Sequence, residues 1–389
     1  MPEAESWVRV GSSIDPDTTA ALAELLDQLD APATPKLLVL MAAPRYDLAT
    51  LAAGLRESLP DSPLIGCSSS GEIASCGALT QAVVLWALGG SGISTSTGWG
   101  TSEGQGLRAA ASQAARCLET LEQQRAHTVL MLLSDGLGGD QMEVVRGAYD
   151  IATVEVPLVG GCAGDYLAMR RTLQLHDQRV MQGAVVAAAI TSDRPLGVGV
   201  SHGWTPISEP MLVTGSRDTV LATLDDKPAL DVFLDFFQPP EAVRNDPEAF
   251  ADFAATHPIG IRRRERIEMR HITGFDASSR SLIMVAEVPQ GALAFLTEGD
   301  FNSVLGAAAQ SCESAIAALG GSAPQGLLLF DCVSRRSVFS EERVQEETDL
   351  IRRCSDGIPM AGFYTYGEIA RTKGAGGFHN QTLVTLAIG

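Results

Sequence analysis

Short apolar runs separated by amphipathic stretches recur three times along the chain. Each set opens with a stretch that places apolar residues at helical spacing, as Leu22, Leu25 and Leu29 do in the first. An apolar run of strand length follows, then a polar loop, a second short helix and another apolar run. The first runs read KLLVLMAA, HTVLMLLSD and GLLLFDCV, and the closing runs read AVVLWAL, AVVAAAI and TLVTLAI. This pattern predicts an α/β fold with mixed sheets, built from repeated helix-strand-helix-strand-strand units.

A glycine segment before each closing run carries the strongest similarity between the sets. GCSSSGEI occupies residues 66–73 and GFYTYGEI residues 362–369, and both read G-x-x-x-x-G-E-I. A looser copy, GGCAGDY at residues 160–166, ends in the Gly-acid pair Gly164 and Asp165. A proline and one or two apolar residues precede each copy, as in PLIG, PLVG and PMAG. The repetition predicts internal duplication.

The section between about 194 and 299 has a different pattern, with alternating apolar and polar residues and frequent turn signals. It predicts a β-rich middle, interrupted by one helix near 229–237 and by an exposed linker, QPPEAVRNDPEAF. Before it, TLQLHD and GAVVAAAI are expected to pair as a hairpin. We therefore predict a lead-in at 1–35, an N-terminal region at 36–200 and a C-terminal region at 201–389. The last divides into a β-rich part, 201–299, and a third unit, 300–389.

Turn and capping residues place several helix starts. Asp15 followed by Pro16 predicts a helix with the aspartate as its N-cap, and Asp47 is expected to begin the next helix. Ser340 is the expected cap of the last helix. These assignments depend on local sequence alone.

Composition narrows the class of protein. With 389 residues, 45% of them hydrophobic and 19% charged, the chain can bury a large core. Its formal charge of −19 argues against nucleic acid and against a basic membrane anchor, since both partners require a basic face. Seven cysteines without a C-x-x-C pair indicate reduced thiols. The acidic first residues lack the features of a signal peptide, and no apolar run could span a bilayer, so we expect a cytoplasmic protein without membrane insertion.

Several separated motifs, in order, resemble the FIST family. They are GCSSSGEI, the run SHGWTPI…VTGS…LDDKPALDVF, the strand ending FDCVSRR, and the terminal GFYTYGEIA…HNQTLVTLAI. That family pairs an N-terminal and a C-terminal FIST region, and the resemblance covers almost everything after about Lys36. It implies an intracellular sensory module that binds a small ligand such as an amino acid.

The resemblance also bears on partners and cofactors. FIST regions are often fused to signalling outputs, but no kinase, cyclase, PAS or F-box segment remains here, so signalling would pass through a separate partner. Some stand-alone proteins of the family resemble haem-binding nitric oxide sensors that regulate a partner histidine kinase. The cofactor is therefore left open, with haem as an alternative to an amino-acid ligand.

The glycine segments supply the candidate ligand site. Glycines allow close backbone approach and positive φ, exposed amides can hold an anion, and nearby acids can meet an ammonium group. An α-amino acid carries both charges. The same residues also fit a structural role, with glycines turning the strand and acids capping amides. The candidates are Gly66, Cys67, Gly71, Glu72, Gly160, Cys162, Gly164, Asp165, Cys332, Arg335, Gly362, Tyr364, Gly367 and Glu368.

The sequence gives less support to nucleotide binding or to catalysis. The glycine pattern is not a nucleotide loop, because Glu-Ile follows where a Walker A loop has Lys and then Ser or Thr. No catalytic motif is recognisable, so we expect no enzyme. A thiol-dependent hydrolase using Cys332 or Cys162 remains an alternative, since Arg335 and Arg336 could lower the pKa of Cys332.

Histidines are the candidate haem ligands. His202 in SHGW and His271 in MRHITG lie in β-like runs and could each bind iron through the imidazole. His176 and His379 are weaker candidates. Covalent c-type attachment is excluded because there is no C-x-x-C-H.

Overall fold

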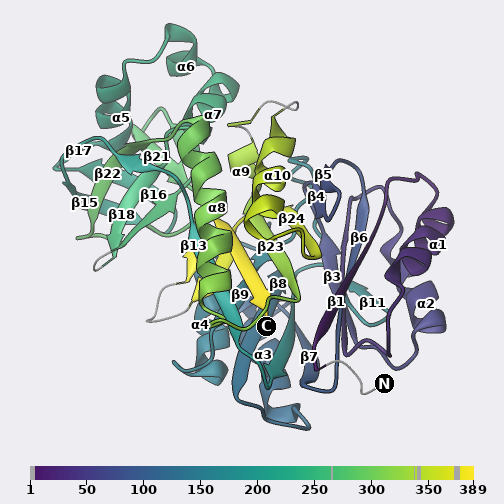
Figure 1. The fold of residues 1–389 in the computed structure, drawn as a ribbon. Helices are drawn as coiled ribbons and strands as arrows, with labels where there is room; N and C mark the ends of the chain where they lie inside the picture. Colours follow the sequence, from purple (N-terminus) through teal and green to yellow (C-terminus); the bar gives the residue numbers. More distant parts are fainter. Residues whose placement is uncertain (1–4, 264–265, 337, 340–342, 372–376) are drawn as a thin grey trace.

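The structure, a computed structural model, describes residues 5–263, 266–336, 338–339, 343–371 and 377–389. It is a mixed α/β fold, as predicted, with three repeated units and a separate β-rich part (Figure 1). Within these residues no helix is long and apolar enough to cross a membrane. Ser340, the expected helix cap, lies outside the described residues.

Each unit has the same order of elements: strand, helix, strand, helix, strand, short hairpin, strand. The first unit contains β1 (Trp7–Ser13), α1 (Thr18–Leu29), β2 (Leu37–Ala42), α2 (Leu48–Ser58), β3 (Leu64–Ser68), β4 (Glu72–Ala74), β5 (Gly77–Leu79) and β6 (Val83–Gly89). The second contains β7 (Ile93–Thr101), α3 (Gly106–Ala115), the 3-10 helix η1 (Arg116–Thr120), β8 (His127–Ser134), α4 (Met142–Ala152), β9 (Leu158–Cys162), β10 (Gln174–His176), β11 (Arg179–Met181) and β12 (Ala184–Ser192).

The third unit is split by the β-rich part, which is inserted after its first strand. It contains β13 (Leu196–Ser201), α8 (Phe301–Ala317), β23 (Gly326–Cys332), α9 (Val333–Arg336), α10 (Val344–Cys354), β24 (Met360–Thr365), β25 (Glu368–Arg371), β26 (Phe378–His379) and β27 (Leu383–Ile388). The interruption explains why the sequence pattern of this unit begins only at α8.

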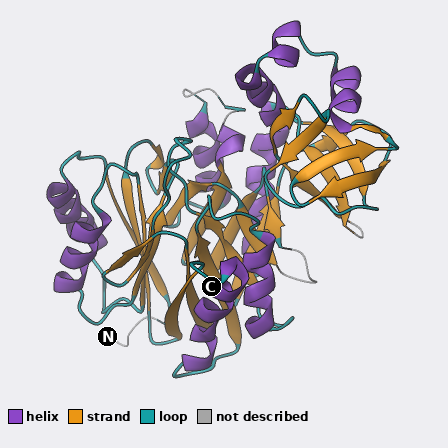
Figure 2. Cartoon of the chain, turned by 180° about the vertical axis from the view of Figure 1, so that it is seen from behind, coloured by secondary structure: helices purple, strands orange, loops and turns teal. Residues whose placement is uncertain are grey.

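The β-rich part forms one nine-stranded antiparallel sheet with three helices. Its strands are β14 (Thr205–Pro206), β15 (Met211–Arg217), β16 (Val220–Leu224), β17 (Lys227–Pro228), β18 (Ile259–Arg263), β19 (Arg266–Arg270), β20 (Ile272–Asp276), β21 (Ser281–Met284) and β22 (Leu293–Glu298). Its helices are α5 (Ala229–Phe237), α6 (Glu241–Asn245) and α7 (Pro247–Ala255). Figure 2 shows it beside the main body, with the helices at its outer end.

The hairpin of each unit pairs with the sheet of another unit. The sheets have the orders β1-β6-β2-β3-β10-β11, β7-β12-β8-β9-β25-β26 and β13-β27-β23-β24-β4-β5. The hairpin of the first unit therefore lies in the third sheet, that of the second in the first, and that of the third in the second. The registers match, since Ile73, Leu175 and Ile369 pair with Gly362, Gly66 and Gly160. The exchange is cyclic and closes three sheets into one body.

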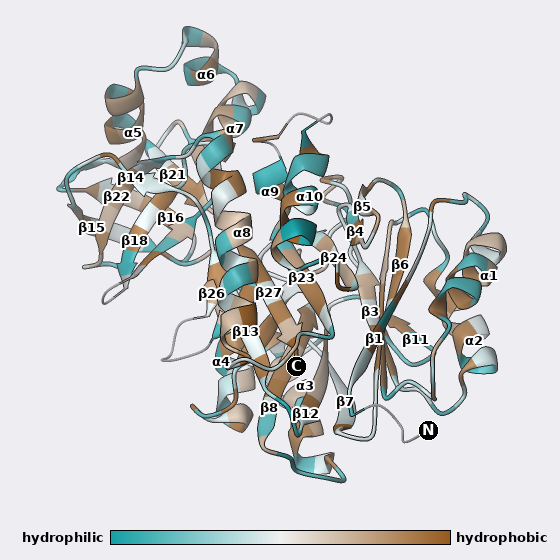
Figure 3. Ribbon diagram, viewed as in Figure 1, coloured by the Kyte–Doolittle hydropathy of each residue, from teal (hydrophilic) through white to brown (hydrophobic). Residues whose placement is uncertain are grey.

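The strands are apolar along their whole length because both faces are buried. In β2, Val39 and Met41 join a cluster shared by all three sheets, whereas Leu38 and Leu40 pack in the cluster of α1 and α2. Met131 of β8 and Phe330 of β23 lie in the shared cluster as well. Figure 3 shows the resulting apolar strands between helices with more polar outer faces. A strand covered on both sides needs no polar alternation.

Three local predictions were wrong. TLQLHD forms the β10–β11 hairpin in the first sheet, while GAVVAAAI forms β12 between β7 and β8, so the two segments do not pair. The predicted linker after α5 is helical over most of its length, as α6 and α7. The N-cap of α1 is Asp17, whose carboxylate accepts two helix amides, and not Asp15. Asp47 caps α2 as predicted.

Candidate functional site

The three glycine segments meet around a pseudo-threefold axis and are joined by a ring of backbone hydrogen bonds. Each segment donates an N–H to the next. The bonds run from Ser70 to Tyr364 (3.0 Å), from Tyr366 to Cys162 (3.1 Å) and from Gly164 to Ser68 (3.1 Å). A second ring joins the same segments, from Ser68 to Leu173, Cys162 to Gly367 and Tyr364 to Gly71. The amides expected to hold an anion are thus used within the protein.

The first glycine of each segment is required by close strand packing. Gly66, Gly160 and Gly362 stand opposite the preceding parallel strand, beside Leu40, Leu132 and Leu329. A Cβ at any of the three would overlap the carbonyl oxygen of that neighbour. Gly160 also has a φ of +148°, which L side chains rarely adopt. These glycines therefore have a structural explanation that needs no ligand.

The strand register places Gln174, and not Asp165, at the position of the two glutamates. Glu72, Gln174 and Glu368 occupy the same place in the three exchanged hairpins. Each side chain accepts the N–H at the start of its unit's closing strand, from Ala82 (2.8 Å), Ala184 (3.1 Å) and Thr382 (3.2 Å). The sequence interpretation that aligned Asp165 with the glutamates was wrong. Because a neutral amide serves in one copy, this position requires an acceptor and not a charge.

Both glutamates are buried and bonded by hydroxyl groups. Glu72 accepts from Ser69 and from Tyr166 (2.8 Å), while Glu368 accepts from Thr365 (2.6 Å) and Thr382 (2.7 Å). Burial raises the pKa of each carboxyl to about 7, against the lowering effect of these hydrogen bonds. Near neutral pH each glutamate is therefore close to half-protonated. In its protonated form it is neutral, as Gln174 is.

Asp165 has a separate role in the loop that follows it. Its carboxylate accepts N–H groups of Met169 (3.0 Å), Arg170 (2.7 Å) and Arg171 (2.9 Å), and the hydroxyl of Tyr366. It organises a turn and has no bond to a neighbouring hairpin strand.

The three candidate cysteines are buried thiols. Burial raises the pKa of Cys67 and Cys332 well above the usual value, and raises that of Cys162 to about 12. A lowered pKa of Cys332 beside Arg335 and Arg336 was the alternative to a buried strand-end cysteine, and the structure favours the buried cysteine. Desolvation has the largest effect, and the nearby Glu368 raises the pKa further. These thiols are poor nucleophiles in this state.

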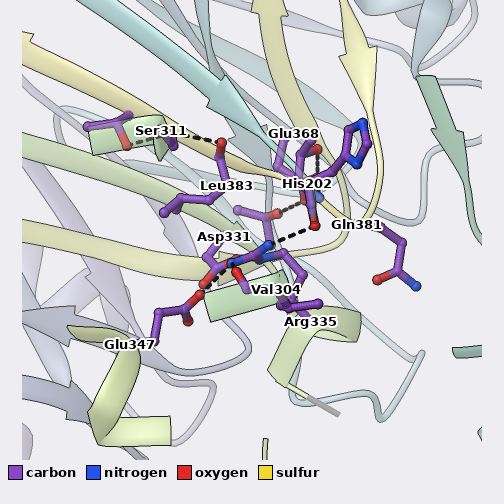
Figure 4. Close-up of polar contacts among 12 residues, drawn as sticks. His202, Val304, Ser311, Asp331, Arg335, Glu347, Glu368, Gln381 and Leu383 are labelled. Carbon is purple, nitrogen blue, oxygen red and sulfur yellow. Dashed lines mark hydrogen bonds and ion pairs between the residues drawn. The ribbon is translucent and has the colours of Figure 1, made fainter. Parts of the chain in front are cut away.

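Arg335 lies at the centre of a buried ionic cluster that the sequence showed only in part (Figure 4). Its guanidinium donates to Asp331 of β23 (2.7 Å) and to Glu347 of α10. It also donates to the carbonyl oxygens of Val304 in α8 and His202 before β14, both at 3.2 Å. Burial and the nearby Glu347 raise the pKa of Asp331 well above its usual value. A proton on Asp331 would lower the amount of negative charge buried around Arg335.

The seam between the third unit and the β-rich part is polar. We define it by His202, Trp204, His271, Asn380 and Gln381. The Gln381 side-chain Nε2 donates to the carbonyl oxygen of Ala255 (2.8 Å) and lies 3.2 Å from His271 Nδ1. The indole of Trp204 donates to the backbone oxygen of Gln381 (3.1 Å). A single turn, 380–381, thus holds both sides of the seam together.

Two amide oxygens in the seam lack partners among the described residues. Asn380 and Gln381 are at most 1% exposed, and neither Asn380 Oδ1 nor Gln381 Oε1 accepts a hydrogen bond there. A buried acceptor without a donor costs about 1–3 kcal/mol. The positive φ of Gln381 (+60°) is not special to this site, since Gln81 (+55°) and Gly183 (+57°) precede the other closing strands with the same backbone. The unpartnered side chains are what distinguish this copy.

The candidate haem histidines are already bonded to the protein. His202 Nδ1 accepts the N–H of Trp204 (3.0 Å), and its ring also bonds the backbone of Ile267. His379 Nε2 lies 2.9 Å from the oxygen of Ala370, and His176 Nε2 lies 3.1 Å from the Thr97 hydroxyl. Burial lowers the pKa of His202 and His271 to about 4, so both are neutral. Because His202 Nδ1 already accepts a hydrogen bond, His202 could bind iron through this nitrogen only after rearrangement.

Sequence reasoning found part of this site and missed the rest. The structure brings Arg335, Cys332, Tyr364 and Glu368 of the predicted set close to Asp331, while Glu72 lies in another hairpin and Asp165 in the loop before β10. It missed Asp331, Glu347, Asn380 and Gln381. The spacing of Asp331 and Arg335 was a readable signal, because the two residues are four apart at the end of a strand. Nothing local marks Asn380 or Gln381.

Comparison with known proteins covers most of the chain. Residues 36–227 match the FIST N domain and residues 229–371 match the FIST C domain. An uncharacterized protein of Mycobacterium tuberculosis strain H37Rv is 25% identical over 390 residues, covering 96% of this chain and 97% of the relative. An uncharacterized protein of Mycobacterium bovis is 28% identical over 234 residues, covering 58% of each. The chain belongs to the FIST family, whose domains are generally linked to small-ligand sensing in signalling proteins.

Proposed function

We propose that this chain is a sensor that binds a small ligand carrying N–H donors, such as the ammonium group of an amino acid, and signals through a separate partner. The observation that carries the proposal is the pair of buried, unpartnered amide oxygens at Asn380 and Gln381. A ligand that donates to both would satisfy groups that the described residues leave unpaired.

The position of these two residues supports signalling as well as binding. Gln381 contacts Ala255 and His271 of the β-rich part, while its own backbone begins the turn into β27 of the third unit. Arg335 adds a second link, from the third unit to His202. A ligand held by residue 381 would therefore interact with both sides of the seam. It would favour whichever arrangement of the two parts satisfies its donors best.

The sequence-based candidates divide under this proposal. Glu368 lies beside the ionic cluster, and its effect on the pKa of Asp331 indicates that the two acids are close. Glu72, Glu368 and Asp165 each accept several hydrogen bonds from the protein, so we assign all three to the scaffold and not to the ammonium group. The haem sensor and the thiol hydrolase gain no support from the contacts of the histidines and cysteines.

The test is a binding screen with matched variants. Thermal-shift measurements with the twenty amino acids would identify ligands, and calorimetry would then compare the wild type with Asn380→Leu and Gln381→Leu. A lost hydrogen bond to a charged donor is worth about 1.5–3 kcal/mol, so we expect at least tenfold weaker binding in each variant. Gln325→Leu, a partly exposed glutamine outside the seam, should bind as the wild type does.

Two outcomes would count against the proposal. One is an amine ligand whose affinity is the same in wild type, Asn380→Leu and Gln381→Leu. The other is a ligand that binds tightly but leaves small-angle scattering and partner affinity unchanged, because equal binding to both arrangements shifts no population.

A further inference from the structure

A loop in the second unit breaks the threefold repetition. In the first and third units, the residue that accepts a hydrogen bond from the start of the closing strand lies six positions after the first glycine of the glycine segment. Glu72, for example, lies six positions after Gly66. In the second unit, Gln174 follows Gly160 by fourteen positions. Eight extra residues are therefore inserted, within 165–173. The other two units exchange their hairpins without such a loop, so the exchange itself does not require it.

The inserted loop has an uncommon backbone that is held by many contacts. Tyr166, Leu167 and Met169 have φ values of +58°, +61° and +52°. Such left-handed conformations in non-glycine residues cost about 1–2 kcal/mol each. The carboxylate of Asp165 binds three amides of the loop, and the Leu167 N–H donates to the Tyr366 hydroxyl (2.7 Å). The loop conformation is thus fixed before any partner arrives.

The tip of the loop exposes apolar and basic side chains together. The side chains of Leu167 and Met169 are 57% and 60% exposed, among the most exposed large apolar residues that the structure describes. Arg170 and Arg171 follow and are exposed, and neither has an ion pair with a described residue. A surface with methionine, leucine and two arginines on a rigid loop has the composition of a binding site for protein.

We propose that residues 167–171 dock a protein partner that presents an apolar side chain flanked by acidic groups. Charge complementarity selects this partner: the chain has a formal charge of −19, so an acidic partner is repelled over most of the surface and attracted at this loop. Two arginines are too few for an anionic membrane, for which clusters of four to eight basic residues are typical. The proposal rests on the proposed function only in assuming a separate partner, and the ligand site plays no part in it.

The fixed backbone explains how a small surface would suffice. Docking onto a mobile loop must meet the entropic cost of ordering it. Here the contacts of Asp165 and Tyr366 already order the loop, so most of the interaction energy would appear as affinity. The same contacts predict that Asp165→Asn weakens docking without removing any residue from the surface itself.

A displayed library of random peptides, selected on the full chain, provides the probe. We expect enriched peptides to combine Asp or Glu with a large apolar residue. Their affinity should fall at least tenfold in Arg170→Glu/Arg171→Glu and in Leu167→Ser/Met169→Ser. The matched controls are Arg352→Glu/Arg353→Glu, another adjacent exposed pair, and Leu212→Ser/Val220→Ser, with 43% and 38% exposure. Controls should stay within twofold of the wild type.

Replacement of the peptide acids by lysine should restore binding to Arg170→Glu/Arg171→Glu. The proposal is overturned if no peptide is enriched over that variant, or if enriched peptides bind wild type and both loop variants alike. Cosedimentation with phosphatidylserine vesicles that is lost in Arg170→Glu/Arg171→Glu, without acidic peptides, would assign the loop to a membrane instead. Gln381→Leu should leave peptide binding unchanged, so a failure of the ligand site is separable from a failure here.

Discussion

The first and third units have the same architecture but differ at the end of the central strand. Both keep the G-x-x-x-x-G-E-I segment, the close approach of its first glycine and the glutamate that holds the closing strand. The shared register places Ala42 of the first unit where the third has Asp331. Four residues later, Tyr46 corresponds to Arg335. The first unit thus has an alanine and a tyrosine where the third has an ion pair.

This difference separates scaffold from specialised chemistry. Positions that recur in all three units are explained by strand contacts and hydrogen bonds within the protein, including the residues that the sequence marks most clearly. Arg335, which occurs in the third unit only, contacts the β-rich part, and so does the side chain of Gln381, whose counterpart in the first unit is Gln81. In a duplicated fold, the unrepeated residues are therefore the better candidates for function.

The largest expected effect is on the ionic cluster of the third unit. Arg335→Met would leave Asp331 and Glu347 buried without a cation, and we expect the free energy of unfolding to fall by about 3–5 kcal/mol. Urea unfolding measures the change. The control is Arg108→Met, because the pair of Arg108 and Asp150 is exposed to solvent and should contribute little to stability. Equal losses in the two variants would show that burial of the cluster has no special role.

The next effect tests whether the glycines are scaffold in every unit. Gly66→Ala, Gly160→Ala and Gly362→Ala each place a Cβ against a strand carbonyl. We expect losses of about 1–3 kcal/mol in urea unfolding, with Gly160 the most sensitive because of its positive φ. Gly306→Ala in α8, where a Cβ meets open space, should be neutral or stabilise by up to about 1 kcal/mol. Full stability of any ring variant would argue for a ligand role of that glycine.

A smaller effect concerns the glutamates that correspond to Gln174. Their folded pKa of about 7 exceeds the reference value of 4.5, so the folded state holds a proton that the unfolded state releases. Their contribution to stability is complete below about pH 4.5 and is lost as pH rises through 7. Glu72→Gln and Glu368→Gln should each flatten this decline and gain about 1–3 kcal/mol above pH 7. Unfolding curves from pH 5 to 8 measure it.

The reciprocal variant sharpens the same comparison. Gln174→Glu should introduce into the second unit the pH dependence that the glutamate variants lose. The free energy of unfolding of the wild type and of all three variants could instead show the same slope between pH 5 and 8. In that case, protonation at these three positions does not affect stability.

Much of the fold could be predicted because apolar runs and glycine segments repeat in order. What the sequence could not show is which sheet each hairpin joins. The runs LQLH and AVVAAAI look like neighbours in a hairpin, yet β10 joins the first sheet and β12 the second. Local propensity cannot show whether a hairpin pairs within its own unit or with the sheet of another unit, because a strand has the same apolar pattern in both cases.

The site was harder to predict for a related reason. Duplication marks shared residues such as Glu72 and Glu368, whereas Gln381 acquires its role from Ala255 and His271, more than a hundred residues earlier. The sequence comparison aligned Asp165 with the two glutamates because it also follows a glycine. In the structure, the residue that pairs at their position is Gln174. A single sequence shows repetition well and long-range contacts poorly.

The smallest expected effect tests a difference between helices of corresponding position. Asp47 caps α2 of the first unit, accepting the Ala49 N–H at 3.0 Å, whereas no side chain among the described residues caps the start of α10 in the third unit. Asp47→Ala should therefore cost about 1 kcal/mol in urea unfolding. Asp47→Asn keeps the acceptor and should lose only a few tenths, which distinguishes the hydrogen bond from the charge. Because α2 lies outside the ring and the seam, ligand and peptide binding should stay unchanged. A loss of binding in Asp47→Ala would mean that the first unit contributes more than scaffold.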